Sequence, residues 1–389
     1  MITRTISPVI ERAATKYPIV TLTGPRQSGK TTFCREFFHG YTYVNLEELQ
    51  LREFANRDPR GFFRSYPPPI VIDEIQNCPS LVSQIQVEAD ERRTNGEFVI
   101  TGSQQIELLA AISQSLAGRT AIFTLLPFSC AELQGYGRSF SRNELILAGG
   151  MPRVYEYDID PGEYYRNYIS THLERDVRGI LNVKNFSRFE TFLKLMAGRT
   201  GQLVNFSAMA SDIGVSSTTL QEWATVLEAA HVIFRINPWH INLGKMLTKT
   251  PKYYFTDTGV VCSLLGITTV RHLEFHPMLG SLFENFVVVE KLKQKFNSGS
   301  PVSLYFYRTQ KGSEIDIIEA QANILTPWEI KLSETLLKDF FRHLRLFRND
   351  AQQSGYVCGT SERPGGIIYS GENIASYEGW QCVNYMNIS

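Results

Sequence analysis

The sequence predicts an α/β protein whose N-terminal part is a parallel sheet covered by helices on both faces. Residues 1–130 alternate short apolar runs with segments of helical periodicity. Short buried runs separated by helices are typical of parallel sheets, because each crossover connection places a helix over one face. The expected strands are Ile19–Thr23, Tyr41–Leu46, Ile70–Asp73, Phe98–Thr101 and Ala121–Leu126.

Length and composition narrow the class of protein. The chain has 389 residues, more than one hydrophobic core usually organises, so two or three domains are expected. Its 39 Lys and Arg balance 39 Asp and Glu, so any nucleic-acid binding must depend on a local patch. The six cysteines form no Cys-x-x-Cys pair, which argues against a zinc site and fits a cytoplasmic location. No apolar run approaches the length of a membrane span, so no membrane partner is expected.

The segment after the first expected strand matches the phosphate-binding motif G-x-x-x-x-G-K-S/T in full. Its glycines let backbone N–H groups curl around a phosphate, and the helix that follows adds positive potential at its N-terminus. Lys30 would neutralise phosphate charge, and the Thr31 hydroxyl would bind Mg²⁺. We therefore expect ATP and Mg²⁺ as cofactors. The expected nucleotide-binding residues are Gly24, Pro25, Arg26, Gln27, Ser28, Gly29, Lys30, Thr31, Thr32 and Asp73.

Two carboxylates end the third expected strand, Ile70–Asp73. Asp73 would hold Mg²⁺ through water, and Glu74 would orient and deprotonate the attacking water as general base. Many buried strands end in acidic residues, so this pattern alone is weak. Downstream of a complete P-loop and on a strand of its own, it predicts an ATPase.

Ser103 and Arg119 are further catalytic candidates. Ser103 follows the strand Phe98–Thr101 and could reach the γ-phosphate or the attacking water, although a plain helix cap would look the same. Arg119 lies just before the last expected strand, a position that faces the neighbouring subunit in AAA+ assemblies. It could act in trans as an arginine finger, which implies a homo-oligomer, or it could pair with a local acid.

Together these motifs resemble a large prokaryotic family of ATP-binding proteins, which pair an AAA-type core with a C-terminal domain of unknown function. The resemblance extends over nearly the whole chain, and its P-loop part is specific. It implies an architecture and leaves the pathway open. The segments that carry it are Gly24–Thr32, Ile70–Gln76, Thr101–Gln104, Ser115–Arg119, Leu126–Phe128 and Gly149–Pro152.

The middle of the chain predicts a helical segment with a helix-turn-helix between Ser207 and Ala230, followed by short strands. Gly214 would form the turn. The second helix lacks Lys and Arg, and the phosphate contacts that supply most non-specific DNA affinity need positive charge. We expect a winged-helix-like segment that serves for packing, and a DNA-binding role is the alternative.

The C-terminal third predicts a separate α/β domain with a pair of acidic residues on neighbouring strands. Side chains alternate along a strand, so Glu329 and Lys331 face the same side. If the strands pair, Asp316 and Glu329 can share one Mg²⁺, with Lys331 orienting a water and Glu284 as an outer ligand. This pattern is similar to the PD-(D/E)XK nuclease fold. A solvated edge hairpin, or a nuclease-like fold kept for binding, would give the same residues.

The sequence thus predicts an AAA+-like P-loop ATPase core at residues 1–148, a helical lid and winged-helix-like segment at 149–250, and a PD-(D/E)XK nuclease-like domain at 251–389. The leading hypothesis is an AAA+ ATPase that couples nucleotide state to the C-terminal domain, with DNA as a candidate substrate. One alternative is a nucleotide-dependent switch with a protein partner and an inactive nuclease-like fold. A second alternative is a DNA-binding regulator that uses the helix-turn-helix.

Overall fold

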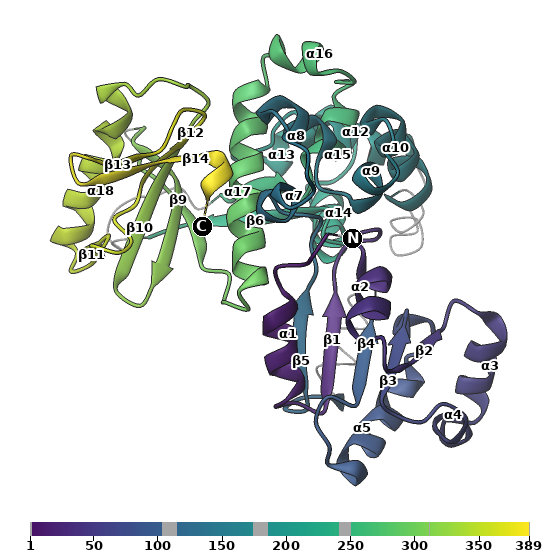
Figure 1. Ribbon diagram of the computed structural model, residues 1–389. Coiled ribbons are helices and arrows are strands. Elements are labelled where there is room, and N and C mark those ends of the chain that lie inside the picture. Colours follow the sequence, from purple (N-terminus) through teal and green to yellow (C-terminus); the bar gives the residue numbers. More distant parts are fainter. Residues whose placement is uncertain (1, 103–114, 174–185, 241–249, 311, 389) are drawn as a thin grey trace.

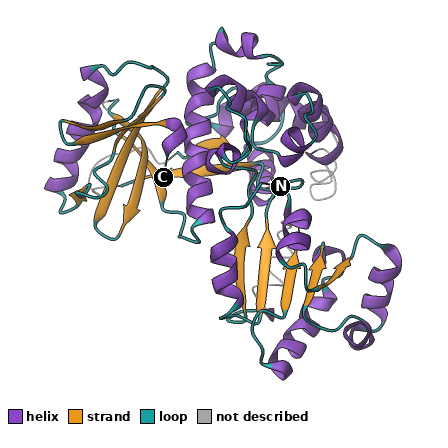
Figure 2. Cartoon of the chain, viewed as in Figure 1, coloured by secondary structure: helices purple, strands orange, loops and turns teal. Residues whose placement is uncertain are grey.

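The computed structural model describes residues 2–102, 115–173, 186–240, 250–310 and 312–388. It contains an N-terminal sheet, a group of helices next to the carboxyl edge of that sheet, and a second sheet formed largely by the C-terminal part (Figure 1). Helices and strands alternate in the N-terminal part, whereas the later strands of the described residues all belong to the second sheet (Figure 2). Within the described residues, no helix is both long enough and apolar enough to cross a membrane.

The N-terminal sheet has five strands in the order β2-β3-β4-β1-β5, all parallel. The parallel sheet expected from the sequence is therefore confirmed. Strand β1 is fully buried between β4 and β5, so the segment that follows it emerges at the carboxyl edge beside the ends of these two strands. The strands are β1 (Ile19–Thr23), β2 (Thr42–Asn45), β3 (Ile70–Asp73), β4 (Phe98–Thr101) and β5 (Thr120–Thr124).

Helices cover both faces of this sheet. One face packs against Ile10 of α1 and Phe33 of α2. The other face packs against Phe62 of α4 and Ile85 of α5. These contacts bury the apolar side chains of the strands on both sides, as a parallel sheet requires. The helices are α1 (Ser7–Ala14), α2 (Lys30–Phe37), α3 (Leu49–Arg57), α4 (Pro59–Ser65) and α5 (Ser80–Arg92).

The middle of the chain is helical, as expected. The two helices predicted around Gly214 are present: Gly214 has a φ of 75°, and the Ser216 hydroxyl accepts a hydrogen bond from Thr219 N at the start of the second helix. A stretch of π-helix at Ile169–Leu173 follows α10. The helices are α7 (Cys130–Gln134), α8 (Arg142–Ala148), α9 (Pro152–Glu156), α10 (Pro161–Tyr168), α12 (Phe186–Ala197), α13 (Phe206–Ile213) and α14 (Ser217–Ala229).

The second sheet has nine strands in the order β13-β14-β12-β10-β9-β8-β6-β7, with β11 beside β10. Its strands are β6 (Ile233–Pro238), β7 (Lys252–Phe255), β8 (Leu304–Arg308), β9 (Glu314–Gln321), β10 (Ile324–Lys331), β11 (Val357–Cys358), β12 (Gly366–Tyr369), β13 (Ile374–Tyr377) and β14 (Trp380–Asn384). Strand β6 pairs with both β7 and β8. The sheet is therefore continuous across residue 250, where the sequence places a domain boundary, and that boundary stays a prediction.

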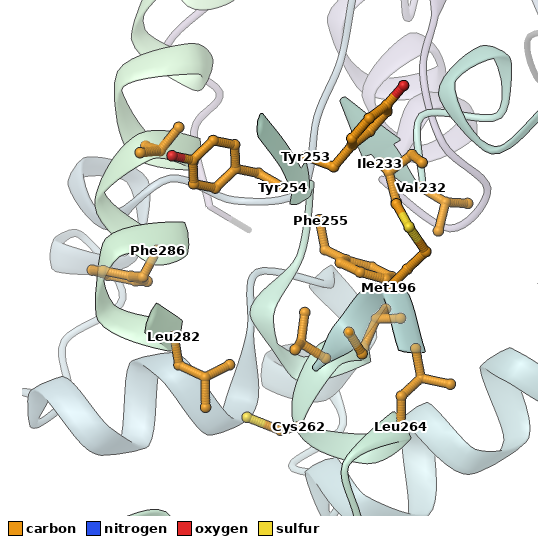
Figure 3. Packing of buried hydrophobic residues seen from close by; sticks show 14 of the residues in the cluster. Met196, Val232, Ile233, Tyr253, Tyr254, Phe255, Cys262, Leu264, Leu282 and Phe286 are labelled. Carbon is orange, nitrogen blue, oxygen red and sulfur yellow. The ribbon is translucent and has the colours of Figure 1, made fainter. Parts of the chain in front are cut away.

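The long helix α17 (Leu279–Asn297) lies between the second sheet and the middle helices (Figure 1). Leu282 and Phe286 of this helix belong to the core that also holds Phe255 of β7 and Met196 of α12 (Figure 3). One hydrophobic core thus joins the middle segment to the C-terminal part. The remaining helices are α15 (Thr258–Leu264), α16 (Val270–Glu274) and α18 (Arg342–Gln353).

Helix α17 also contacts the segment that follows β5. Lys293 Nζ donates to the carbonyl oxygen of Phe128 at 2.7 Å and to Glu290 Oε1 at 2.8 Å. Glu290 Oε2 accepts from Cys130 N at 2.8 Å. All of these groups are buried, so the ion pair and its backbone partners satisfy one another. These contacts therefore connect helix α17 of the C-terminal part to the segment just after β5 of the N-terminal sheet.

Candidate nucleotide-binding site

The P-loop connects β1 to the N-terminus of α2. Gly24 has a φ of 140°, and a Cβ atom there would lie 2.2 Å from the carbonyl oxygen of Leu125, so only glycine fits. Gly29 has a φ of 93° and precedes the first residue of α2, Lys30. The free N–H groups of the first turn of α2 therefore point toward the loop, which is the arrangement that binds phosphate. Ser28, within the loop, is fully buried.

Lys30 is buried and binds the backbone of the loop. Its Nζ donates to the carbonyl oxygens of Gly24 at 3.0 Å and Pro25 at 2.9 Å. Burial lowers the pKa of Lys30, and the carboxylates of Glu74 and Asp73 act in the opposite direction. The lysine, the loop and both acidic residues at the end of β3 therefore lie within electrostatic reach of one another.

Asp73 receives hydrogen bonds from three hydroxyl groups. Thr31 Oγ1 donates to Asp73 Oδ2 at 2.7 Å, and the Tyr43 hydroxyl donates to the same oxygen at 2.5 Å. Thr101, the last residue of β4, donates to Asp73 Oδ1. The structure thus brings together Thr31 and Asp73, the two residues expected to hold Mg²⁺. Their hydroxyl and carboxylate oxygens are hard donors, which suit this ion.

Glu74 follows β3 in a left-handed backbone conformation, with a φ of 57°. Its carboxylate accepts from Gln76 Nε2. Burial raises the pKa of Glu74, and the positive charge of Lys30 opposes that rise. A carboxylate with a raised pKa is a better proton acceptor, which is the property that a general base needs.

A cavity of about 270 Å³ adjoins the P-loop. Gly29, Thr32 and Phe33 form one wall, and Phe128 and Pro152, which follow β5, form another. An apolar lining with a few polar groups is typical of sites for small molecules. Phe128 and Pro152 belong to segments that carry the resemblance, but only the fold shows that they line this cavity, because distant segments of the chain assemble it.

The remaining expected site residues have different outcomes. Ser103 lies outside the described residues. Arg119 pairs with Asp90 of α5 through Nε–Oδ1 and Nη2–Oδ2 distances of 2.6 and 2.9 Å; Asp90 is exposed and Arg119 is partly exposed. This is the local ion pair that the sequence leaves open as an alternative to a role in trans.

Gln27 accepts a hydrogen bond from the Tyr164 hydroxyl of α10 at 2.5 Å. Arg26 lies close enough to Lys30 and Glu74 to influence the pKa of each.

The acidic residues of the C-terminal sheet also lie together. Asp316 Oδ2 accepts from the backbone N of Ile330 at 2.8 Å, where β9 and β10 separate. Glu329 is buried, and Lys331 Nζ donates to its Oε2 at 2.5 Å. Burial and the nearby charge of Asp316 raise the pKa of Glu329 to about 8, and Lys331 opposes that rise. Two carboxylates and one ammonium group therefore interact where β9 and β10 separate.

Glu284 of α17 completes this acidic cluster. Its Oε1 accepts from the Tyr254 hydroxyl at 2.7 Å and from Lys252 Nζ at 3.2 Å, and the same ammonium contacts Glu314 at 2.6 Å. Sequence reasoning missed Lys252 and Tyr254, because only the pairing of β7 with β6 brings them to this sheet. Among the described residues, no group of three or more His, Cys, Asp or Glu side chains is arranged to hold a metal ion. The expected metal site thus depends on Asp316 and Glu329.

Similar sequences occur in several bacteria. The uncharacterized protein Rv2008c of Mycobacterium tuberculosis is 31% identical over 368 residues, which cover 94% of this chain and 79% of that protein. The uncharacterized protein Mb2031c of Mycobacterium bovis matches to the same extent. The chain belongs to the family of these mycobacterial proteins. A protein of Haemophilus influenzae is 21% identical over 313 residues, covering 72% of this chain and 75% of its own.

Models of three domain families match consecutive segments of this chain. Residues 16–134 match an AAA domain, residues 140–271 match a domain of unknown function (DUF8612), and residues 279–383 match another (DUF4143). The first match covers the P-loop and the end of β3, so the N-terminal part is an AAA-type ATP-binding domain. The resemblance noted from the sequence is thus confirmed for this domain. The nuclease-like and winged-helix assignments find no support in the other two matches.

The similarity to solved structures is weaker than the similarity to these families. The Walker-type ATPase PABY2304 of Pyrococcus abyssi aligns with a TM-score of 0.48 and 18% identity, covering 68% of this chain and 96% of that one. AMPPCP-bound DnaA from Aquifex aeolicus aligns with a TM-score of 0.31 and 12% identity, covering 57% and 85% of the two chains. Neither likeness is close enough to bear on function.

Proposed function

We propose that this protein hydrolyses ATP in its N-terminal domain and couples the nucleotide state to its C-terminal domain. The observation that carries the proposal is the contact between Thr31 Oγ1 and Asp73 Oδ2, 2.7 Å apart beside a complete P-loop. Mg²⁺, when bound by these two residues, would neutralise charge on the nucleotide phosphates. The base of the nucleotide would occupy the cavity beside Gly29 and Phe33.

The residues around the phosphates divide the catalytic work. Lys30 exchanges the carbonyl oxygens of Gly24 and Pro25 for phosphate oxygens and neutralises their charge. Glu74 orients the attacking water and accepts its proton, since its pKa is raised by burial. The buried contacts of Lys293 and Glu290 with Phe128 and Cys130 support coupling, because they join α17 to the segment after β5.

The first prediction tests hydrolysis. Purified protein with Mg²⁺ should turn over ATP, and Glu74→Gln should reduce turnover by about 100-fold or more while keeping ATP affinity, because an amide cannot accept the proton. Phosphate release and equilibrium binding measure the two quantities separately. Glu53→Gln on the exposed face of α3 is the matched control and should behave like the wild type. Full turnover in Glu74→Gln would contradict the assignment of the base.

A second prediction concerns assembly. We propose a homo-oligomer in which Arg119 leaves its partner Asp90 and reaches the nucleotide of a neighbouring subunit. Arg119→Ala should then bind ATP normally and hydrolyse it at least about 10-fold more slowly, and wild-type turnover per chain should rise with protein concentration. Asp90→Ala breaks the same ion pair but keeps the arginine, so it should remain active. A strictly monomeric wild type with concentration-independent turnover would contradict the role in trans.

A second candidate function belongs to the C-terminal domain. The close association of Asp316, Glu329 and Lys331 favours a nuclease-like metal site that acts on DNA, with Glu284 nearby. One divalent ion held by Asp316 and Glu329 would stabilise two carboxylates that otherwise repel each other. The alternative is a binding role for the same fold with a protein partner, in which Lys252 and Lys331 supply the balancing charge.

A third prediction decides between these two roles. If the domain is a nuclease, the wild type should cut plasmid or single-stranded DNA with Mn²⁺, and Asp316→Asn and Glu329→Gln should each reduce the rate by about 100-fold or more. Glu362→Gln, on an exposed loop, is the control. If the wild type leaves DNA intact, or both variants cut at the wild-type rate, the site serves binding and not cleavage.

A further inference from the structure

A further cavity lies within the C-terminal part, between helix α17 and the second sheet. Its volume is about 440 Å³, which is within the range of small-molecule sites. The last two turns of α17 form one wall, and side chains of β9, β10, β12 and β14 form the opposite wall. The described residues that line it all lie after residue 290, so this cavity is separate from the one beside the P-loop.

Three basic side chains line this cavity. Lys291 and Lys295 lie one turn apart on α17, and Arg363 belongs to the loop before β12. The two lysines share one carboxylate: Glu319 Oε1 lies 3.1 Å from Lys291 Nζ, and Glu319 Oε2 lies 2.5 Å from Lys295 Nζ. The other carboxylate of the lining, that of Glu362, belongs to an exposed residue, where solvent screens its charge. Within the cavity, one carboxylate therefore faces three cations.

Glu319 holds the two lysines in place without neutralising both. It also accepts from Trp328 Nε1 at 3.0 Å, so three donors share its two oxygens. Burial opposes the ionisation of Glu319, yet the charges of the two lysines lower its pKa to about 2. Burial lowers the pKa of Lys291; Glu319 opposes that shift, and the charges of Lys295 and Arg363 add to it. An anion in the cavity would balance the excess positive charge.

The cavity is distinct from the acidic cluster of Asp316 and Glu329. Successive side chains of a strand point to opposite faces of the sheet. Trp328 and Ile330 of β10 both pack in the core that contains α17, so Glu329 between them points to the other face. The two places can therefore be altered independently, and a ligand of this cavity would not be the metal ion proposed for the acidic cluster.

We propose that this cavity binds a phosphate monoester, with Lys291, Lys295 and Arg363 around the phosphate group. A monoester carries a charge of about −1.5 to −2 at pH 7 and has three strong acceptor oxygens, so it matches three cations better than a carboxylate does. Each ammonium has three N–H donors, of which Glu319 takes one, and the guanidinium adds five. The rest of the cavity accommodates the group that carries the phosphate. This site lies outside the ATP site proposed above and does not depend on it.

The test uses adenosine monophosphate as the probe and adenosine as its neutral counterpart. Because the monophosphate can also enter the P-loop, the full chain with Lys30→Ala is the parent protein, and each further change is added to it. Binding is followed by tryptophan fluorescence, since Trp328 lines the cavity and Lys291 Nζ lies 4.7 Å from the centre of its ring. The parent should bind the monophosphate at least about 10-fold more tightly than adenosine. Arg363→Ala should weaken binding of the monophosphate by about 10-fold, as expected for lost hydrogen bonds to a charged group, and Arg363→Lys should weaken it less.

Control variants separate binding from folding and from general charge effects. Arg363 and Lys338 are both exposed, so neither Arg363→Ala nor Lys338→Ala should change the melting temperature, and Lys338→Ala should bind like the parent. Equal affinity for adenosine and its monophosphate would overturn the inference, as would parent-like affinity in both Arg363→Ala and Lys295→Ala. A monophosphate that binds the wild type but not Lys30→Ala occupies only the P-loop, which would support the proposed ATP site and overturn this one.

A second pair of probes identifies the source of the phosphate. A short single strand of DNA with a 5′-phosphate is compared with the same strand ending in a 5′-hydroxyl, without divalent ions. Stronger binding of the phosphorylated strand that is lost in Arg363→Ala assigns the cavity to the end of a nucleic acid. Binding of the monophosphate alone assigns it to a free small molecule. If Arg363→Ala weakens the binding of neither phosphorylated probe, the cavity does not bind phosphate monoesters.

Discussion

Lys30→Ala should reduce the affinity for ATP by about 100-fold or more. The side chain is buried at the N-terminus of α2, and its ammonium is the group placed to replace water around the β- and γ-phosphates. Losing one member of a desolvated, hydrogen-bonded charge pair costs roughly 2–5 kcal/mol, and about 2.7 kcal/mol corresponds to 100-fold in affinity. Titration calorimetry with ATP and Mg²⁺ measures the change directly.

The same substitution also removes two hydrogen bonds within the loop, to Gly24 and Pro25. The effect of a loosened loop on stability must therefore be measured separately from the effect of the lost phosphate contact on ATP binding. The melting temperature of Lys30→Ala without nucleotide reports the first effect, and the stabilisation that ATP adds reports the second. Lys16→Ala, an exposed lysine beyond the end of α1, is the control. If Lys30→Ala keeps wild-type affinity, the P-loop does not bind nucleotide in the expected way.

The N-terminal sheet is predicted well because a short, continuous stretch of sequence specifies each of its buried strands and the P-loop. The buried strands are short continuous apolar runs, and the P-loop must join a strand to a helix for steric and electrostatic reasons. Ile19–Thr23, Ile70–Asp73 and Phe98–Thr101 are observed with the expected bounds. The last expected strand, Ala121–Leu126, is observed at Thr120–Thr124, and Leu125 N just beyond it still donates to Thr23 O at 2.8 Å.

Contacts between distant residues could not be predicted in the same way. Tyr43 and Thr101 both bind Asp73, but they lie on different strands, and only the strand order makes them neighbours of β3. Lys252 reaches Glu284 because β7 joins the second sheet through β6. A 3₁₀ turn at Lys338–Phe341 leads directly into α18, which ends at Gln353. Periodicity alone does not define such ends.

The free energy of unfolding should depend on pH through Glu329. Its folded-state pKa is about 8 against an ordinary value of 4.5, so the folded protein keeps a proton there that the unfolded chain releases. A group whose pKa is raised by folding contributes stability below its unfolded pKa, and that contribution is lost as the pH rises through the folded pKa. Stability should therefore fall between about pH 4.5 and 8, with a slope of up to about 1.4 kcal/mol per pH unit from this one carboxyl group.

Glu329→Gln isolates this contribution, because the amide has the same shape but does not titrate in this range. Urea unfolding followed by tryptophan fluorescence is suitable, since Trp328 is buried beside Glu329. The comparison is best made between pH 6.5 and 8, because His231, whose pKa is lowered by burial, acts with the opposite sign at lower pH. The difference in stability between variant and wild type should grow with pH in favour of the variant, whereas Glu362→Gln should follow the wild type. Parallel pH profiles for wild type and Glu329→Gln would mean that burial and the charge of Asp316 do not raise the pKa of Glu329, and this carboxyl group would then be ionised throughout this range.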